Sequence, residues 1–497
     1  MRKILLFILV ITFSLSKGYS QVRLGMTTGE YAGVNSIHLN PANIINSDYY
    51  LDIQLAGAGT FVLNNYIYLR NEDHSVFELI SGNPDFPTFI DERGNERYVD
   101  NWSGQDLKNG YFNTKVFGPS AMLTYGRHGF AFSTGARSLI RVKDFSYDIA
   151  NYVYEQLDYP DFYNVNYINN IDTHMESVQF AEIALSYNYN VFARNFEKVD
   201  VGATAKYLLP YNAAKFYLDN ADYLMPNSDT LIIFDMNGSL RSSVPVNFDN
   251  NNFPDGSGTF KGSGLGLDIG VVYTRTKSIQ RSYERFTRLC RQKKYDYKYR
   301  VGLSILDIGY VALNKNVQVH EYVNANTFWP ELSDFQFENV TQSLQEISER
   351  LLGAPGASLS ESNNFSMRLP TAISLQADYH YHRNWYFNST LIYGFPAKEN
   401  AFSRPHYASV MPRYEGKYFG AGMPFSLHDF KQPQIGFNIR LLYLTVGTAN
   451  LAHYMGFSEL NGVDLYFTLK FSLLKGNCGR GRTEGCGGFE YGIPSRF

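Results

Sequence analysis

The chain has 497 residues, a net charge of −3 and a mean hydropathy of −0.27. The small negative charge argues against nucleic acid as a partner, and the low hydropathy excludes a membrane protein built from long apolar helices. Tyr and Phe number 39 and 37, which is typical of the aromatic girdles of outer-membrane barrels, although a Tyr-rich soluble β-protein is an alternative.

The stretch 1–20 is expected to be a secretory signal peptide. Arg2 and Lys3 precede an apolar run at 4–15, and small residues lie three and one positions before a plausible cleavage point ahead of Gln21. The run is too short to cross a bilayer as a helix. Residues 21–47 follow as an irregular segment that contains Asn40, Pro41 and Ala42.

From residue 48 onward, apolar and polar residues alternate in many separate segments. The clearest is the last, 464–474, where Leu465, Phe467 and Leu469 fall on one face of an extended chain and Lys470 falls on the other. Eleven residues are about what a tilted strand needs to cross a bilayer. We expect fourteen strands: 49–69, 120–125, 130–142, 181–190, 199–207, 264–273, 299–313, 371–381, 385–395, 408–414, 418–428, 434–441, 444–450 and 464–474.

The connections between these strands alternate between long and short. Long polar loops follow the first, third, fifth, seventh and ninth strands, which predicts that they lie outside and that the short turns face the periplasm. Helices are expected at 149–157 and at 341–352, the second ended by Gly353. A change of phase near Leu306 and Asp307 predicts a bulge.

The pattern favours a closed transmembrane barrel at 48–475 with a Gly-rich periplasmic tail at 476–497. An open sheet in lipid would leave backbone groups unpaired at several kcal/mol each, so a spanning sheet must close. Charged residues fall on the polar face, as they must if the other face contacts hydrocarbon. The residues expected to face the lumen are Lys206, Asp268, Asp378, Arg440 and Lys470.

A basic insert between the sixth and seventh strands is the exception among the short turns. The stretch 275–300 carries ten Lys or Arg but only two acids, Glu284 and Asp296. It could bind an acidic periplasmic partner or lipid phosphates, or it could be a solvated turn. The candidate partner patch is Arg281, Arg285, Arg288, Arg291, Lys293 and Lys294.

The three cysteines are Cys290, Cys478 and Cys486. The last two lie close together in the tail and are expected to form a small disulfide in an oxidising compartment, which leaves Cys290 over. That thiol would be buried or available to a partner.

No residue pattern indicates catalysis, a metal or a cofactor. The glycines at 262–266 precede a strand where a phosphate-binding loop would precede a helix. Asp378, His380 and His382 raise the hypothesis of a metal site, against which hydrogen bonding inside the lumen is the simpler interpretation. No nucleophile elbow or zinc-protease spacing is found, so we expect no enzyme.

Two stretches resemble known families. The segment 33–44, together with 268–273 and 299–309, is similar to a domain-of-unknown-function family, number 5723, of outer-membrane proteins in Bacteroidota-type bacteria. More distantly, Asn40, Pro41 and Ala42 ahead of the first strand resemble the FadL long-chain fatty acid transporter superfamily. That resemblance implies a fourteen-stranded barrel plugged by an N-terminal hatch, here 21–47.

Two functions follow as hypotheses for an outer-membrane protein exported by a cleaved signal peptide. The first is a non-catalytic subunit of an outer-membrane assembly, using its loops, basic insert and tail to bind other outer-membrane or periplasmic proteins. The alternative is a FadL-like passive channel for hydrophobic or small ligands. An apolar pocket behind residues 40–44 would favour the channel, and a lumen filled by side chains would favour the subunit.

Overall fold

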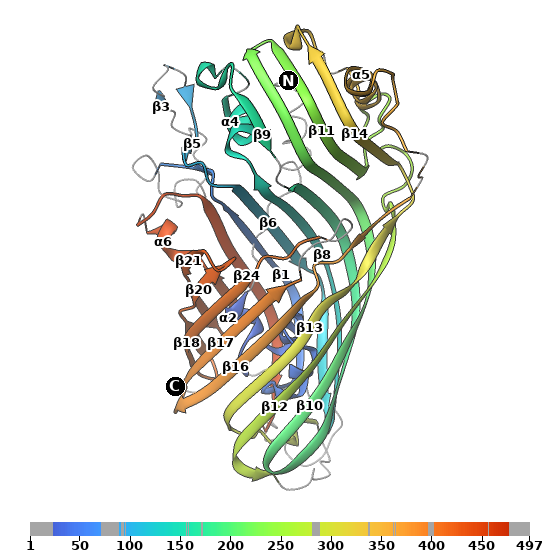
Figure 1. Ribbon diagram of the computed structural model, residues 1–497. Coiled ribbons are helices and arrows are strands. Elements are labelled where there is room, and N and C mark those ends of the chain that lie inside the picture. The colour runs from blue at the N-terminus through green and yellow to red at the C-terminus, as the bar shows by residue number, and fades with distance from the viewer. Residues whose placement is uncertain are drawn as a thin grey trace.

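The computed structural model describes residues 23–70, 89–90, 94, 96–155, 157, 159–169, 172–280, 289–335, 338–360, 362, 364–395, 402–455 and 457–476. The stretch 1–20, predicted to be a signal peptide, therefore lies outside the described residues. The strands roll into one closed antiparallel barrel, and sheet strands rise beyond it at one end (Figure 1). Within the described ranges, no helix is long and apolar enough to span a membrane.

The barrel closes where its first strand, β1 (Tyr49–Asn64), pairs with its last, β24 (Gly462–Leu474). β10 (Thr173–Asn227) turns back at Asn195, which has a left-handed φ of 55°. The wall therefore has thirteen strands when β10 is counted once and fourteen when its two arms are counted separately. The other wall strands are β6 (Lys108–Phe117), β7 (Ser120–Tyr125), β8 (His128–Phe145), β12 (Gly262–Gln280), β13 (Tyr297–Leu313), β15 (Phe365–Arg368), β16 (Ala372–His382), β17 (Trp385–Gly394), β18 (Tyr407–Glu415), β19 (Phe419–Gly422), β20 (Phe425–His428), β21 (Gln432–Ile435), β22 (Phe437–Leu441) and β23 (Leu444–Thr448).

Alternation along the strands separates an apolar outer face from a polar inner face. On β17, Phe387 and Tyr393 are exposed outside while Asn388 and Thr390 are buried inside. β24 behaves as predicted, with Leu469 outside and Lys470 inside. An outer wall of this composition is suited to hydrocarbon.

Several wall strands are made of two short pieces, and this explains the main errors at strand boundaries. β6 and β7 are two parts of one strand that both pair with β1 and β8, interrupted at Gly118 and Pro119. Residues 71–115 were predicted to be a loop, which was wrong for 108–115, because a proline that cannot donate a ladder hydrogen bond hides the continuity. Pro424 separates β19 from β20 in the same way.

The bulge predicted near Leu306 and Asp307 is confirmed. The register of β12 against β13 shifts there, and Asp307 has a left-handed φ of 55°. At the same place β13 changes its partner from β16 to β15. The bulge directs the Asp307 side chain into the lumen, where it is buried.

At the long-loop end, the sheet continues beyond the barrel as an extension. β9 (Asn166–Asn169) and β11 (Thr230–Ser243) pair with the far end of β10, and β14 (Val317–Trp329) pairs with β11 (Figure 1). The long loops predicted after the fifth and seventh strands therefore contain β11 and β14, which the fourteen predicted strands do not include. Phase shifts at bulges obscured them in the sequence.

Helices and short strands complete the described chain. The helix predicted at 341–352 is α5 (Val340–Leu352), and Gly353 ends it with a φ of 82°. The helix predicted at 149–157 is α4 (Tyr147–Glu155). The remaining elements are β2 (Ile67–Tyr68), β3 (Phe89–Ile90), β4 (Glu96–Arg97), β5 (Asp100–Asn101), η3 (Pro160–Phe162), η4 (Leu289–Arg291), η5 (Leu332–Asp334) and α6 (Leu451–Tyr454).

Residues 23–47 lie inside the barrel, and we call them the hatch segment. They form α2 (Leu24–Thr27), η1 (Gly33–His38) and η2 (Pro41–Asn46), and α2 is drawn inside the ring of strands in Figure 1. Leu24, Val34, Ile37 and Ile44 are almost completely buried against the inner wall. The N-terminal part of the chain thus fills the barrel at the end where the turns are short.

Candidate functional site: a plugged lumen

Asn40 is the centre of the contact between the hatch segment and the wall. Its side-chain oxygen accepts a hydrogen bond from the Ala42 amide at 2.9 Å, which caps η2, and Pro41 occupies the first helical position. Its amide nitrogen donates to the carbonyl oxygens of Val271 and Leu303 and to Gln376 Oε1, at 3.0–3.3 Å. One side chain therefore both shapes the hatch and joins it to three wall strands.

A row of wall glycines allows this close approach. Gly202 on β10 pairs directly with Gly270 on β12, and Gly302 on β13 lies one strand further on. A Cβ atom at Gly202 would lie 2.5 Å from the carbonyl oxygen of Pro41 and 2.6 Å from the amide nitrogen of Ala42. Cβ atoms at the other two positions would meet the Asn40 side chain. These three positions of the wall therefore carry no side chain where the hatch lies against them.

Further polar contacts hold the hatch on both sides of Asn40. Asn188 donates to the carbonyl oxygen of Ala42 at 2.9 Å, and Asn46 donates to Asp200 at 3.0 Å. On the opposite wall, Asp52 accepts a hydrogen bond from the Val34 amide at 2.7 Å. These contacts are hydrogen bonds across a seam, without strand pairing, so the hatch can part from the wall without breaking the barrel.

A small cavity of about 30 Å³ remains between the hatch and β13, β16 and β17. Arg300, Asp378 and Asn43 line it, and each has a buried polar atom with no hydrogen-bond partner among the described residues. A polar space of this size holds one or two water molecules. The cavity described here is polar and is not the apolar pocket that a channel would need behind residues 40–44.

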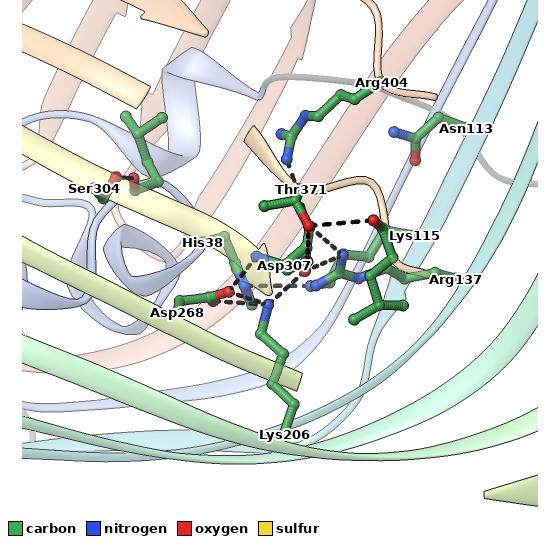
Figure 2. Close-up of polar contacts among 12 residues, drawn as sticks. His38, Asn113, Lys115, Arg137, Lys206, Asp268, Ser304, Asp307, Thr371 and Arg404 are labelled. Carbon is green, nitrogen blue, oxygen red and sulfur yellow. Dashed lines mark hydrogen bonds and ion pairs between the residues drawn. The ribbon is translucent and has the colours of Figure 1, made fainter. Parts of the chain in front are cut away.

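Above the hatch, a belt of buried charges crosses the lumen. Asp307 is at its centre, with Lys206 Nζ at 2.6 Å, Arg137 Nη1 at 3.0 Å and Arg404 Nη1 at 3.4 Å (Figure 2). Asp268 pairs with the same lysine at 2.7 Å. One lysine and two arginines therefore converge on a single carboxylate that is shielded from solvent.

Glu182 extends the belt on the far side of Arg137. It pairs with Lys115 at 2.5 Å and with Arg137 at 2.8 Å. Lys115 in turn donates to His38 Nδ1 of the hatch segment at 3.2 Å. Burial, followed by the charge of Lys115, lowers the pKa of His38 well below its usual value, so the ring stays neutral and accepts this bond. His38 connects the hatch to the belt.

On the long-loop side of the belt, the inner wall is apolar. Val178 and Phe180 precede Glu182 on β10, and Val311 and Leu313 follow Asp307 on β13, all with side chains turned inward and buried. Phe402 packs into the same cluster, and the neighbouring Ser403 amide donates to Glu176 Oε2 at 2.9 Å. The inner apolar cluster is Phe61, Leu63, Tyr111, Leu139, Val178, Phe180, Leu208, Ala213, Val311, Leu313, Phe365, Met367, Leu369 and Phe402.

The base of the hatch, at the short-turn end, holds two buried carboxylates. Glu30 lies just before η1 and Asp48 just after η2, and Lys294 Nζ is 3.2 Å from the first and 2.5 Å from the second. Lys475 donates to the backbone carbonyl oxygens of Ile45 and Ser47 at 2.8 and 2.7 Å. Burial, followed by the charge of Asp48, raises the pKa of Glu30 to about 8.

This pKa predicts a pH-dependent docking of the hatch. Glu30 has an ordinary pKa of 4.5 when released and about 8 when docked, so its contribution is complete below pH 4.5 and is lost as the pH rises to about 8. A buried cysteine in place of Ser36 should react faster with maleimide across this range. Glu30→Gln mimics the protonated acid and should remove the trend.

The comparison with Glu30→Gln is needed because Lys475 acts in the opposite direction. Burial lowers the pKa of Lys475 to about 7, so its contribution grows as the pH rises from about 7 to 10.5. The difference between the two proteins isolates the glutamate. Equal labelling profiles from pH 5 to pH 8.5 would contradict this role for Glu30.

The lumen-facing charges named from the sequence all lie inside the barrel. Lys206 and Asp268 belong to the belt, and Asp378 binds Arg413 Nη2 at 2.7 Å beside the cavity. Lys470 donates to the carbonyl oxygen of Ala32 at 2.8 Å, and the Arg440 guanidinium lies 4.2 Å from the ring centroid of Tyr31. Three of the five therefore contact the hatch or line the cavity beside it.

The basic insert and the cysteines are arranged differently from expectation. Lys294 pairs inside the protein, Arg291 and Lys293 also make contacts, and Arg281, Arg285 and Arg288 lie outside the described residues. Cys290 is disulfide-bonded, so the expectation that it is left over was wrong. Cys478 and Cys486 lie outside the described residues, and in a chain with three cysteines their predicted bond and a bond to Cys290 cannot coexist.

The metal hypothesis finds no supporting geometry. His380 Nε2 lies 2.6 Å from the carbonyl oxygen of Arg383 and its ring stacks on Tyr386, while His382 is exposed. In the part of the chain that the structure describes, no group of three or more His, Cys, Asp or Glu side chains is placed to hold a metal ion.

Comparisons with known proteins give one family and several distant structures. The model of a family of unknown function, DUF5723, matches residues 41–448, whereas no curated protein matches. The toluene transporter TbuX of Ralstonia pickettii is 9% identical with a TM-score of 0.40, covering 92% of this chain and 98% of that one. A Pseudomonas aeruginosa FadL homologue is also 9% identical, with a TM-score of 0.28 and coverages of 91% and 98%.

Proposed function

This chain belongs to the family of unknown function DUF5723, and from the plugged barrel that it forms we propose a FadL-like passive channel for small hydrophobic molecules in an outer membrane. The hatch segment closes the channel and must shift for a molecule to pass. The short turns face the periplasm in this proposal, and the extension faces outward.

The inner apolar cluster is the observation that carries the proposal. An aqueous pore has a polar inner wall, because water and polar solutes must be hydrogen-bonded along it. Here the inward residues on the long-loop side are mostly Phe, Leu, Val and Met, and they are buried. A surface of this kind favours an apolar solute over a sugar or an ion.

The hatch contacts support the same function. The hatch is held by hydrogen bonds, by Lys294 at its base and by His38 at the belt, and the glycine row gives it a fitted seat. A permanent structural filling needs no such separable seam. The cavity beside the hatch is lined by polar groups, so this part of the seam is not sealed by apolar packing.

Uptake measured in whole cells tests the proposal, because a lipopolysaccharide outer leaflet slows hydrophobic molecules that phospholipid vesicles let through. Cells that make the protein should accumulate a hydrophobic naphthylamine dye faster than cells without it, and should show no gain for a sugar of similar size. Folded protein in the membrane is verified by heat-modifiable migration in gels. Equal dye uptake with folded protein present would overturn the proposal.

The extension gives a reason to keep the assembly-subunit hypothesis as a second candidate. Ile168, Val323 and Phe328 are 61–66% exposed on strands that lie beyond the barrel wall, where a partner protein could cover them. Purification in mild detergent tests this hypothesis. A partner protein recovered at a fixed molar ratio would support a subunit role. Recovery of this protein alone, free of other proteins, would count against it.

A further inference from the structure

The stretch 289–296 of the basic insert lies against the base of the hatch, and we call it the strap. Lys294 is its contact residue, bridging Glu30 and Asp48 at 3.2 and 2.5 Å. These two carboxylates stand at the opposite ends of the stretch that contains η1 and η2. A single ammonium group therefore joins both ends of the hatch.

The strap is itself fixed to the barrel. The Gln292 side chain donates to the carbonyl oxygen of Thr124, in β7, at 2.7 Å. The amide of Gly476, just after β24, donates to the carbonyl oxygen of Cys290 at 2.7 Å. Through Lys294 the hatch is therefore tied to two strands of the wall at the short-turn end.

The exposure of the three charges shows which of them can be released. Glu30 and Asp48 have side chains that are 3% and 6% exposed, whereas Lys294 is 38% exposed. Lys294 Nζ contacts both carboxyl groups and compensates the charge of whichever is ionised, which would otherwise be an unpaired buried charge. Lys294 is the cation, and it is partly exposed, so an anion from solvent can bind it while Glu30 and Asp48 stay buried.

We propose that the strap is a latch, in which Lys294 holds the hatch segment closed from the short-turn end. The latch regulates the channel of the proposed function, but its effect on the hatch does not depend on what the channel carries. Release of Lys294 leaves Asp48 without its cation and Glu30 without its donor, so the stretch 30–48 loses the contact that joins its two ends. High salt or an acidic group that binds Lys294 loosens the hatch.

Labelling of a cysteine in the hatch tests the latch. Ser36, which is 4% exposed, is replaced by cysteine, and its rate of reaction with maleimide is measured above the background of the parent protein. Lys294→Gln should raise the rate roughly tenfold. Lys294→Arg should restore slow labelling, and Lys298→Gln, which changes an exposed lysine of the same region, should leave it unchanged.

Salt separates a latch from a merely structural lysine. Raising KCl from about 50 to about 500 mM should speed labelling of the Ser36→Cys protein, because the ion pair is partly exposed and screened, and should have little effect after Lys294→Gln. Equal rates for Lys294→Gln and its parent, with both folded by heat-modifiable migration, would overturn the latch. Faster labelling without faster dye uptake would support the latch and count against the channel.

Discussion

Gly202→Ala is expected to lift the hatch off the wall and to open the channel. The added methyl group would lie 2.5 Å from the carbonyl oxygen of Pro41, and the obstacle is backbone, which cannot rotate away. Overpacking of this kind costs about 1–3 kcal/mol, so the released fraction of the hatch should rise roughly 5- to 150-fold. Maleimide labelling at Ser36→Cys and uptake of the naphthylamine dye should both increase.

Gly110→Ala is the matched control for this substitution. Gly110 also lies in a wall strand, but a Cβ atom there would meet only Val142 Cβ at an ordinary 3.7 Å. Labelling and uptake should stay at the parent level. If Gly202→Ala behaves like Gly110→Ala, the hatch does not rest on the wall at that point.

Asp307→Asn should strongly destabilise the barrel. The belt contains four cations, Lys115, Arg137, Lys206 and Arg404, against the three carboxylates of Glu182, Asp268 and Asp307. Removing the central carboxylate leaves these four buried cations facing only two carboxylates, which costs about 3–5 kcal/mol. Asparagine tolerates the left-handed φ of 55° at this bulge, so the loss reports on charge and not on backbone strain.

Urea unfolding followed by heat-modifiable migration measures this loss. Glu321→Gln removes an exposed pair with Arg241, where the two charged atoms are 3.6 Å apart, and should cost at most about 1 kcal/mol. Adding Arg404→Met to Asp307→Asn removes a cation whose ion pair is with Asp307 and should recover part of the loss. A cost for Asp307→Asn no larger than that of Glu321→Gln would show that the belt does not stabilise the fold.

The sequence predicted the wall well wherever alternation was uninterrupted. The faces of β12 and β24, the bulge at Asp307 and the helix ended by Gly353 all follow from local rules of side-chain direction and capping. β14 was missed because Asn324, with a φ of 51°, shifts its phase, and because half of its residues are polar. Local patterns do not show how far a strand continues beyond the lipid.

The candidate site was predicted only in part, for a physical reason. The alternation of side chains along a strand placed Lys206 and Asp268 inside. It could have placed Glu182 inside as well, since that residue alternates with Ile183 and Leu185. The alternation does not predict the direction of the Asp307 side chain, because the bulge changes the phase of the strand there. The pairing of Lys294 with Glu30 depends on how an insert folds back beneath the barrel, and no local signal in the sequence reports that.

The seam between β1 and β24 also bears on how the protein is assembled. Asp48 alone separates the hatch segment from β1, and β1 is one of the two strands that must meet for the ring to be completed. Lys470 on β24 donates to the carbonyl oxygen of Ala32. It reaches this position when β24 pairs with β1. Closure of the barrel at this seam and docking of the hatch against the inner wall therefore depend on the same strand.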